Sequence, residues 1–134
     1  MIVVDTNIIA YLYLESGRSS QVEQLLEKDA QWAAPLLWRS ELRNVLALYI
    51  RKNLMSLVDA QQIMREAMLL MKGREYEVTS FQVMELVTSS DCSAYDCEFV
   101  ALAEDLGTSL VTVDKKILKE FPQIAVSLDG FIVS

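Results

Sequence analysis

The sequence contains no histidine, and this absence excludes several kinds of chemistry. Catalysis by Ser-His or Cys-His pairs and histidine-bound zinc sites are both ruled out. Cysteine is scarce: Cys92 and Cys97 are five positions apart, which fits no Cys-x-x-Cys zinc or redox motif, so we expect free thiols in a reducing cytoplasm. Four widely spaced glycines cannot build a glycine-rich phosphate loop, which disfavours enzymes with nucleotide cofactors.

Long apolar runs and an excess of positive charge are also missing. No run approaches the ~20 residues of a membrane-spanning helix, and the first five residues lack the basic segment of a signal peptide. We therefore expect a soluble, cytoplasmic protein with no membrane partner. Its 12 basic and 19 acidic side chains give a net charge of −7, which argues against a non-specific nucleic-acid coat protein. A nuclease whose basic residues are local is still allowed.

The composition is that of a folded protein: the chain has 134 residues, of which 52% are hydrophobic. We expect a single domain over residues 1–134. Short apolar runs alternate with helical patterns, which predicts an α/β fold: a three-layer α/β/α sandwich with a central, mainly parallel sheet. Strands are expected at residues 2–4, 31–34, 76–78, 110–113 and 125–127.

The helices between these strands have readable ends. Pro35 is expected to open a helix that ends near residue 53, and Ser56 to cap the next, which stops at residue 73. Ser93 is expected to cap a helix that Gly107 closes. In that last helix one apolar stripe is expected to face the core, and Glu98 is assigned to the outer face. The stripe consists of Tyr95, Phe99, Leu102 and Leu106.

Four acidic residues occupy unusual positions. Asp5 and Asp114 each directly follow a predicted strand, and α/β sheets bind ligands at that edge. Glu41 and Asp96 have apolar residues one helical turn away and no basic partner there. Each also has a structural interpretation. Asp5 and Asp114 would serve as helix N-caps, Glu41 would be partly exposed, and Asp96 would complete a capping box with Ser93.

Together these carboxylates, without histidine, suit a hard divalent cation, Mg²⁺ or Mn²⁺. With such an ion they can activate water and neutralise a phosphodiester. Candidates to hydrogen-bond the acids are Thr6, Asn7, Asn44 and Thr112. A fifth acid, Asp91, is interpreted as a loop residue.

The segments that carry these acids resemble the PIN domain family. They are Val3–Asn7, the helix around Glu41, Ser93–Glu104 and Leu110–Asp114. The resemblance covers the whole chain, whose length is that of the small, free-standing members, the VapC-like toxins of toxin–antitoxin pairs. It implies four or five parallel strands in the order 3-2-1-4-5, which places Asp5 and Asp114 on adjacent strands.

The resemblance also implies a Mg²⁺- or Mn²⁺-dependent endoribonuclease. Its catalytic and metal-binding residues would be Asp5, Glu41, Asp96 and Asp114. It further implies a homodimer and an antitoxin that inserts a segment into the acidic groove. Because the chain is acidic, RNA contact has to come from local cations. Lys115 and Lys116 are the first candidates, and Arg18, Arg51 and Lys52 are further candidates. The two lysines are also consistent with solvated residues at the start of a helix.

Two other functions are consistent with the residues. In the first, the chain is a catalytically idle PIN-like binding or interaction module with a structural cation site. In the second, Asp5 is the nucleophile of an aspartyl-phosphate enzyme, which is disfavoured because Asn7 replaces the second Asp of an Asp-x-Asp phosphatase motif. The six methionines are interpreted as core residues, or as a dimer or antitoxin surface if they form an exposed stripe.

Overall fold

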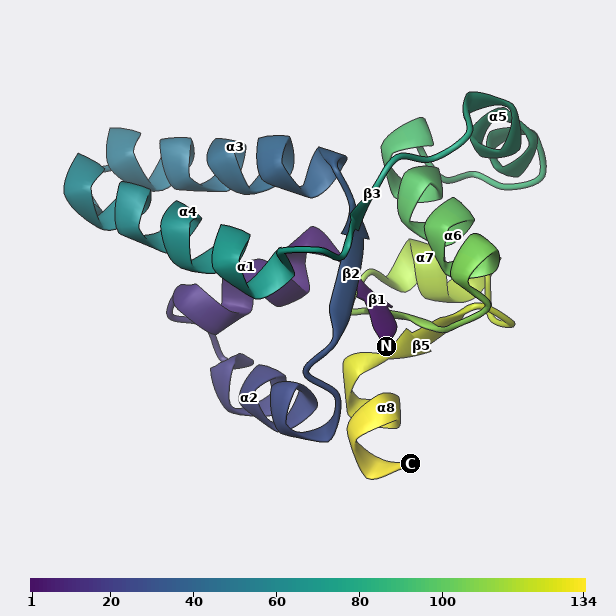
Figure 1. Cartoon of the computed structure of the whole chain (residues 1–134), viewed down its shortest axis with the longest axis horizontal. Helices are drawn as coiled ribbons and strands as arrows, with labels where there is room; N and C mark the ends of the chain where they lie inside the picture. The colour runs from purple at the N-terminus through teal and green to yellow at the C-terminus, as the bar shows by residue number, and fades with distance from the viewer.

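The computed structural model describes every residue from 1 to 134 and shows a parallel sheet between two layers of helices (Figure 1). The strands are β1 (Ile2–Val4), β2 (Trp32–Pro35), β3 (Glu75–Tyr76), β4 (Leu110–Thr112) and β5 (Ala125–Ser127). Their order is β3-β2-β1-β4-β5, and every neighbouring pair is parallel. The predicted α/β sandwich and the strand order 3-2-1-4-5 are therefore confirmed.

Eight helices connect these strands. They are α1 (Thr6–Tyr13), α2 (Ser19–Lys28), α3 (Leu37–Arg51), α4 (Leu57–Met71), α5 (Ser80–Thr88), α6 (Ala94–Leu106), α7 (Lys115–Glu120) and α8 (Leu128–Val133). Helices α1 to α4 lie on one side of the sheet and α5 to α7 on the other, while α8 packs against α2 (Figure 1). This division follows from right-handed crossovers, because the chain moves from β1 toward β3 and then back across to β4 and β5.

The centre of the sheet is the core of the molecule. All residues of β1 and β4 are buried, as expected for short apolar strands covered on both faces. The indole rings of Trp32 and Trp38 are fully buried beside them. No helix combines the length and the apolar character needed to cross a membrane.

Local signals placed several helix ends correctly. The Ser56 hydroxyl accepts a hydrogen bond from the Asp59 N–H, and Ser93 caps α6 in the same way. Gly107 follows α6 with φ at 63°, a left-handed conformation that glycine adopts without strain.

Three local predictions were wrong. Pro35 is the last residue of β2 and does not open α3. The N–H groups of Ala34 and Leu36 donate to the β3-side carbonyls of Arg74 and Tyr76, and Pro35, between them, does not need to donate to that strand. Strand β3 is Glu75–Tyr76, whereas 76–78 was expected. Tyr95 is 63% exposed because it lies in the first turn of α6, ahead of the buried segment 99–103.

Candidate active site

The four predicted acids gather at the carboxyl edge of the sheet. Strands β1 and β4 are neighbours, and Asp5 and Asp114 follow them. Glu41 comes from the second turn of α3 and Asp96 from the first turn of α6, helices that cover opposite faces of the sheet. One pocket of about 240 Å³ brings them together. Its lining residues are Asp5, Thr6, Asn7, Glu41, Asn44, Val45, Asp96 and Asp114.

Two buried threonines hold two of these carboxylates. The Thr112 hydroxyl donates to Asp5 Oδ2 at 2.7 Å, and its oxygen accepts the Asp114 N–H at 3.0 Å. The Thr6 hydroxyl donates to Glu41 Oε1 at 2.6 Å. Both threonines are nearly inaccessible to solvent. Hydroxyl groups therefore fix these two carboxylates without neutralising their charge.

The other two polar candidates, Asn7 and Asn44, also line the pocket. Their side chains are exposed, and they hold none of the acids. Lys115 and Lys116 are exposed at the start of α7, directly after Asp114. Burial raises the pKa of Asp96, and the positive charge of Lys116 partly offsets that rise.

Helix capping explains the acids unequally. Asp114 Oδ1 accepts hydrogen bonds from the N–H groups of Lys116 at 2.9 Å and Ile117 at 3.0 Å, so Asp114 is a true N-cap of α7. Asp5 occupies the N-cap position of α1, but its side chain makes no capping hydrogen bond there. At Asp96 the backbone N–H bonds to the Ser93 hydroxyl at 3.1 Å, and hydrogen bonding to Ser93 partly offsets the raised pKa of the Asp96 carboxyl, as a capping box requires. Capping thus accounts for Asp114 and in part for Asp96. At Asp5, burial raises the pKa of the carboxyl, and the Asn7 N–H only partly offsets that rise.

Burial and mutual repulsion dominate the electrostatics of the pocket. Burial raises the pKa of Asp5, in spite of the hydrogen bond from Thr112, and the charges of Asp96 and Asp114 raise it further. The pKa values of Glu41 and Asp96 are also raised, first by burial and then by neighbouring acids. The chain has two ion pairs, Met1 with Asp29 and Arg39 with Glu75, and neither involves the pocket.

The donor set of this pocket fits a hard divalent ion. It offers oxygen ligands alone, and no side-chain cation competes for them. No three acidic or cysteine side chains are arranged to hold an ion as they stand. Mg²⁺ does not require such a cage, because it retains several waters and binds proteins through one or two carboxylates.

A further acid near the pocket escaped the sequence analysis. Glu98 was assigned to the outer face of α6, but its side chain is only partly exposed and burial raises its pKa. Burial is the main cause of the raised pKa of Glu41, and the negative charge of Glu98 contributes to it. A signal was available, because the residues one turn away from Glu98, Ala94 and Leu102, are apolar, the criterion that singled out Glu41.

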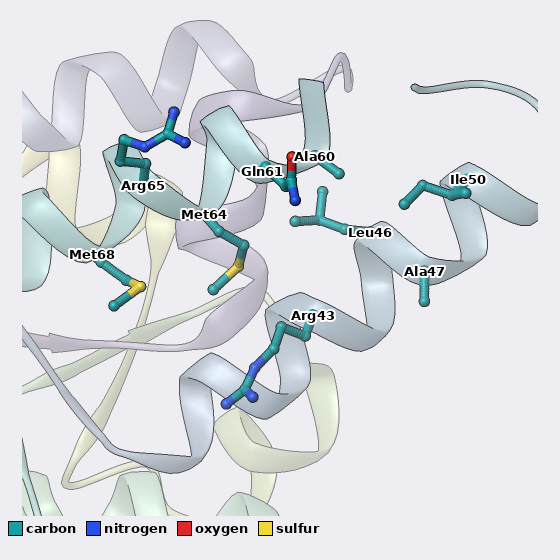
Figure 2. Close-up of a pocket in the computed structure, with 9 residues that line it drawn as sticks. All are labelled: Arg43, Leu46, Ala47, Ile50, Ala60, Gln61, Met64, Arg65 and Met68. Carbon is teal, nitrogen blue, oxygen red and sulfur yellow. The ribbon is translucent and has the colours of Figure 1, made fainter. Parts of the chain in front are cut away.

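An apolar groove of about 430 Å³ lies elsewhere, between α3 and α4 (Figure 2). Arg43 and Arg65 contribute its charged side chains, and none of the four acids reaches it. Met64 and Met68 line this groove, whereas Met71 is buried in the core. The methionines therefore serve both as core and as surface residues.

Comparison with known proteins shows the family to which this chain belongs. The PIN domain family model matches residues 2–124, and the chain belongs to this family. Ribonuclease VapC3 of Pyrobaculum aerophilum is 28% identical to the chain over 126 residues, which are 92% of this chain and 96% of that protein.

Solved structures with the same fold are more distant in sequence. PAE2754 from Pyrobaculum aerophilum has a TM-score of 0.77 at 19% identity, covering 98% of this chain and 93% of that one. A toxin–antitoxin complex from Klebsiella pneumoniae has a TM-score of 0.71 at 19% identity, with coverages of 96% and 98%. FitAcB from Neisseria gonorrhoeae has a TM-score of 0.74 at 18% identity, with coverages of 95% and 96%. These likenesses support the fold.

Proposed function

We propose that this chain is a divalent-metal-dependent endoribonuclease and the toxin of a toxin–antitoxin pair, acting in the cytoplasm. The observation that carries the proposal is the meeting of Asp5, Glu41, Asp96 and Asp114 around one pocket without a cationic partner. The match to a ribonuclease over nearly the whole chain supports RNA as the substrate.

In this proposal, Asp5, Asp96 and Asp114 hold one or two Mg²⁺ or Mn²⁺ ions, and Glu41 completes the cluster. A bound ion supplies an activated water and neutralises charge on the phosphodiester. Thr112 orients the Asp5 carboxylate through Oδ2, which leaves Oδ1 for a ligand. Asp114 uses Oδ1 for the start of α7, so Oδ2 is its available oxygen.

The remaining groups of the pocket position and attract the substrate. Thr6 fixes Glu41 through Oε1 and leaves its second oxygen free. Lys115 and Lys116, which are exposed directly after Asp114, supply positive charge for RNA phosphates. This local charge matters because the chain as a whole carries −7 and would repel a polyanion.

We propose two protein partners: an antitoxin and a second copy of the chain. The toxin–antitoxin complex from Klebsiella pneumoniae, which shares this fold, supports the first. Exposed apolar side chains on α3, α4 and their connection support a protein partner there, since such patches mark interaction sites. They are Leu48, Leu54, Leu57, Val58 and Leu69. Light scattering of the purified chain, alone and with the product of the adjacent reading frame, tests both partners.

The test of the activity is a cleavage assay on purified chain with Mg²⁺, Mn²⁺ or EDTA. Asp5→Asn should reduce metal-dependent cleavage by at least about a hundredfold, while Asp91→Asn, an exposed loop acid, serves as the matched control and should cleave normally. Equal cleavage by both variants would contradict the assignment. Calorimetric Mg²⁺ binding without cleavage of any RNA would instead favour the idle binding module.

A further inference from the structure

A second cavity lies beside helix α6. It measures about 450 Å³, and Ala94 and Glu98 line it, whereas Asp96, between them in sequence, lines the acidic pocket. Leu36, which directly precedes α3 and its Glu41, also lines the second cavity. Both cavities are thus lined by residues from the beginnings of α3 and α6.

The walls of this cavity are mostly apolar and include one aromatic ring. Val78 and Val83 contribute aliphatic surface, and Tyr76 and Met84 contribute a ring and a thioether. Nucleobases bind single-stranded RNA-binding proteins by stacking on such groups. The volume is ample for one base.

Three polar residues line this cavity: Glu77, Ser80 and Glu98. Glu77 and Ser80 are exposed, whereas Glu98 is partly buried, and its carboxylate has neither a hydrogen-bond donor nor an ion-pair partner in the protein. An ionised carboxylate is an acceptor with two oxygens side by side. A ligand that engages both oxygens at once presents two adjacent N–H donors.

We propose that this cavity binds an unpaired guanine of the RNA substrate next to the cleaved phosphodiester, with the Glu98 carboxylate accepting hydrogen bonds from guanine N1–H and the N2 amino group. Guanine is the one standard base with two adjacent donors on its Watson–Crick edge. Adenine and cytosine have a single amino group there, beside an acceptor, and uracil has one N–H. The inference rests on the proposed ribonuclease activity and adds a base preference to it.

The first experiment measures the base preference at the cleavage site without assuming a target sequence. A random single-stranded RNA pool is cut with the wild-type chain in Mg²⁺ or Mn²⁺, and the new ends are sequenced. We expect guanine at one fixed position beside the cut. In Glu98→Gln, whose amide presents only one acceptor, guanine should lose its preference at that position, whereas Glu85→Gln on the exposed surface of α5 should retain it. An unchanged preference in Glu98→Gln would overturn the proposal.

The second experiment tests the hydrogen bonds themselves. Replacing the selected guanine by inosine removes the N2 amino group, and kcat/KM should fall about tenfold for the loss of one hydrogen bond to a charged acceptor. Replacement by 7-deazaguanine leaves the Watson–Crick edge intact and should have little effect. Glu98→Gln should cut the guanine and inosine substrates at similar rates. Equal cleavage of guanine and inosine substrates by the wild type would reject the contact.

Binding measurements separate this inference from the proposed activity. If the wild type cuts no RNA, the ribonuclease proposal fails, and fluorescence anisotropy with Asp5→Asn still compares oligonucleotides that contain guanine or inosine. Tighter binding to guanine that Glu98→Gln removes would support the base site on its own. Equal binding to all oligonucleotides would overturn it. Thermal unfolding of Glu98→Gln checks that the variant is folded.

Discussion

Replacing Thr112 by valine should destabilise the fold through the loss of two hydrogen bonds. The Thr112 side chain is fully buried, donates to Asp5 Oδ2 at 2.7 Å and accepts the Asp114 N–H at 3.0 Å. A hydrogen bond to a charged acceptor is worth about 1.5–3 kcal/mol and a neutral one about 1 kcal/mol. Valine has the same shape but restores neither, so the free energy of unfolding should fall by about 2–4 kcal/mol.

Urea denaturation at neutral pH in EDTA measures this change. With an m-value of about 2 kcal/mol per molar urea, the midpoint should fall by about 1–2 M. Thr79→Val is the matched control, because Thr79 is exposed and its hydroxyl makes no capping hydrogen bond. If Thr112→Val is no less stable than Thr79→Val, the view that hydroxyl groups hold the acidic edge of the sheet is refuted.

Three more predictions concern charge. Glu75→Gln should lower the free energy of unfolding by about 1–2 kcal/mol at pH 7, because hydrogen bonds from Arg39 lower the pKa of Glu75. This stability is present above the ordinary pKa of 4.5 and is lost as the pH falls through the lowered value. The urea midpoints of the wild type and the variant should therefore converge in acid, and a difference that persists there would contradict the cause. Mg²⁺ at ~100 times its Kd should stabilise the wild type by about 2.7 kcal/mol in thermal unfolding and Asp5→Asn far less, and equal stabilisation would place the ion elsewhere. For RNA binding by Asp5→Asn in EDTA, a plot of the logarithm of the association constant against the logarithm of the salt concentration should have a slope near −1.4, for about two phosphate contacts. The slope should be flatter when Lys115→Ala and Lys116→Ala are added. An unchanged slope would exclude the two lysines as phosphate contacts.

How far the sequence predicts this fold depends on the length of each signal. Strand β1 is an unbroken apolar run and β4 is apolar except for Thr112, and buried central strands favour that pattern. Strand β3 has two residues, too few for any periodicity, so its position is set by pairing with β2. The order of the strands came from the family resemblance, because periodicity does not say which strands are neighbours.

The candidate site shows the same limit. Asp5 and Asp114 could be predicted to lie at one edge, because each follows a strand and the ends of parallel strands meet there. The burial of Glu98 and Tyr95 was predicted wrongly. Helical spacing says in which direction around the α6 axis a side chain points, but not at which turn of α6 the sheet begins to cover the helix. That turn is fixed by the tertiary packing of α6 on β1, β2 and β4.

Asp5 and Glu41 differ from Glu75 in the groups that hold their carboxylates. Glu75 accepts hydrogen bonds from Arg39 and Trp38, and the resulting ion pair lowers its pKa and leaves it no charge to offer a ligand. Asp5 and Glu41 are held by threonine hydroxyls, and their pKa values are raised. A hydroxyl fixes a carboxylate but leaves its negative charge uncompensated. Such a pocket destabilises the folded chain until a cation enters, which is the property that a metal-dependent nuclease requires and a purely structural acid cluster would avoid.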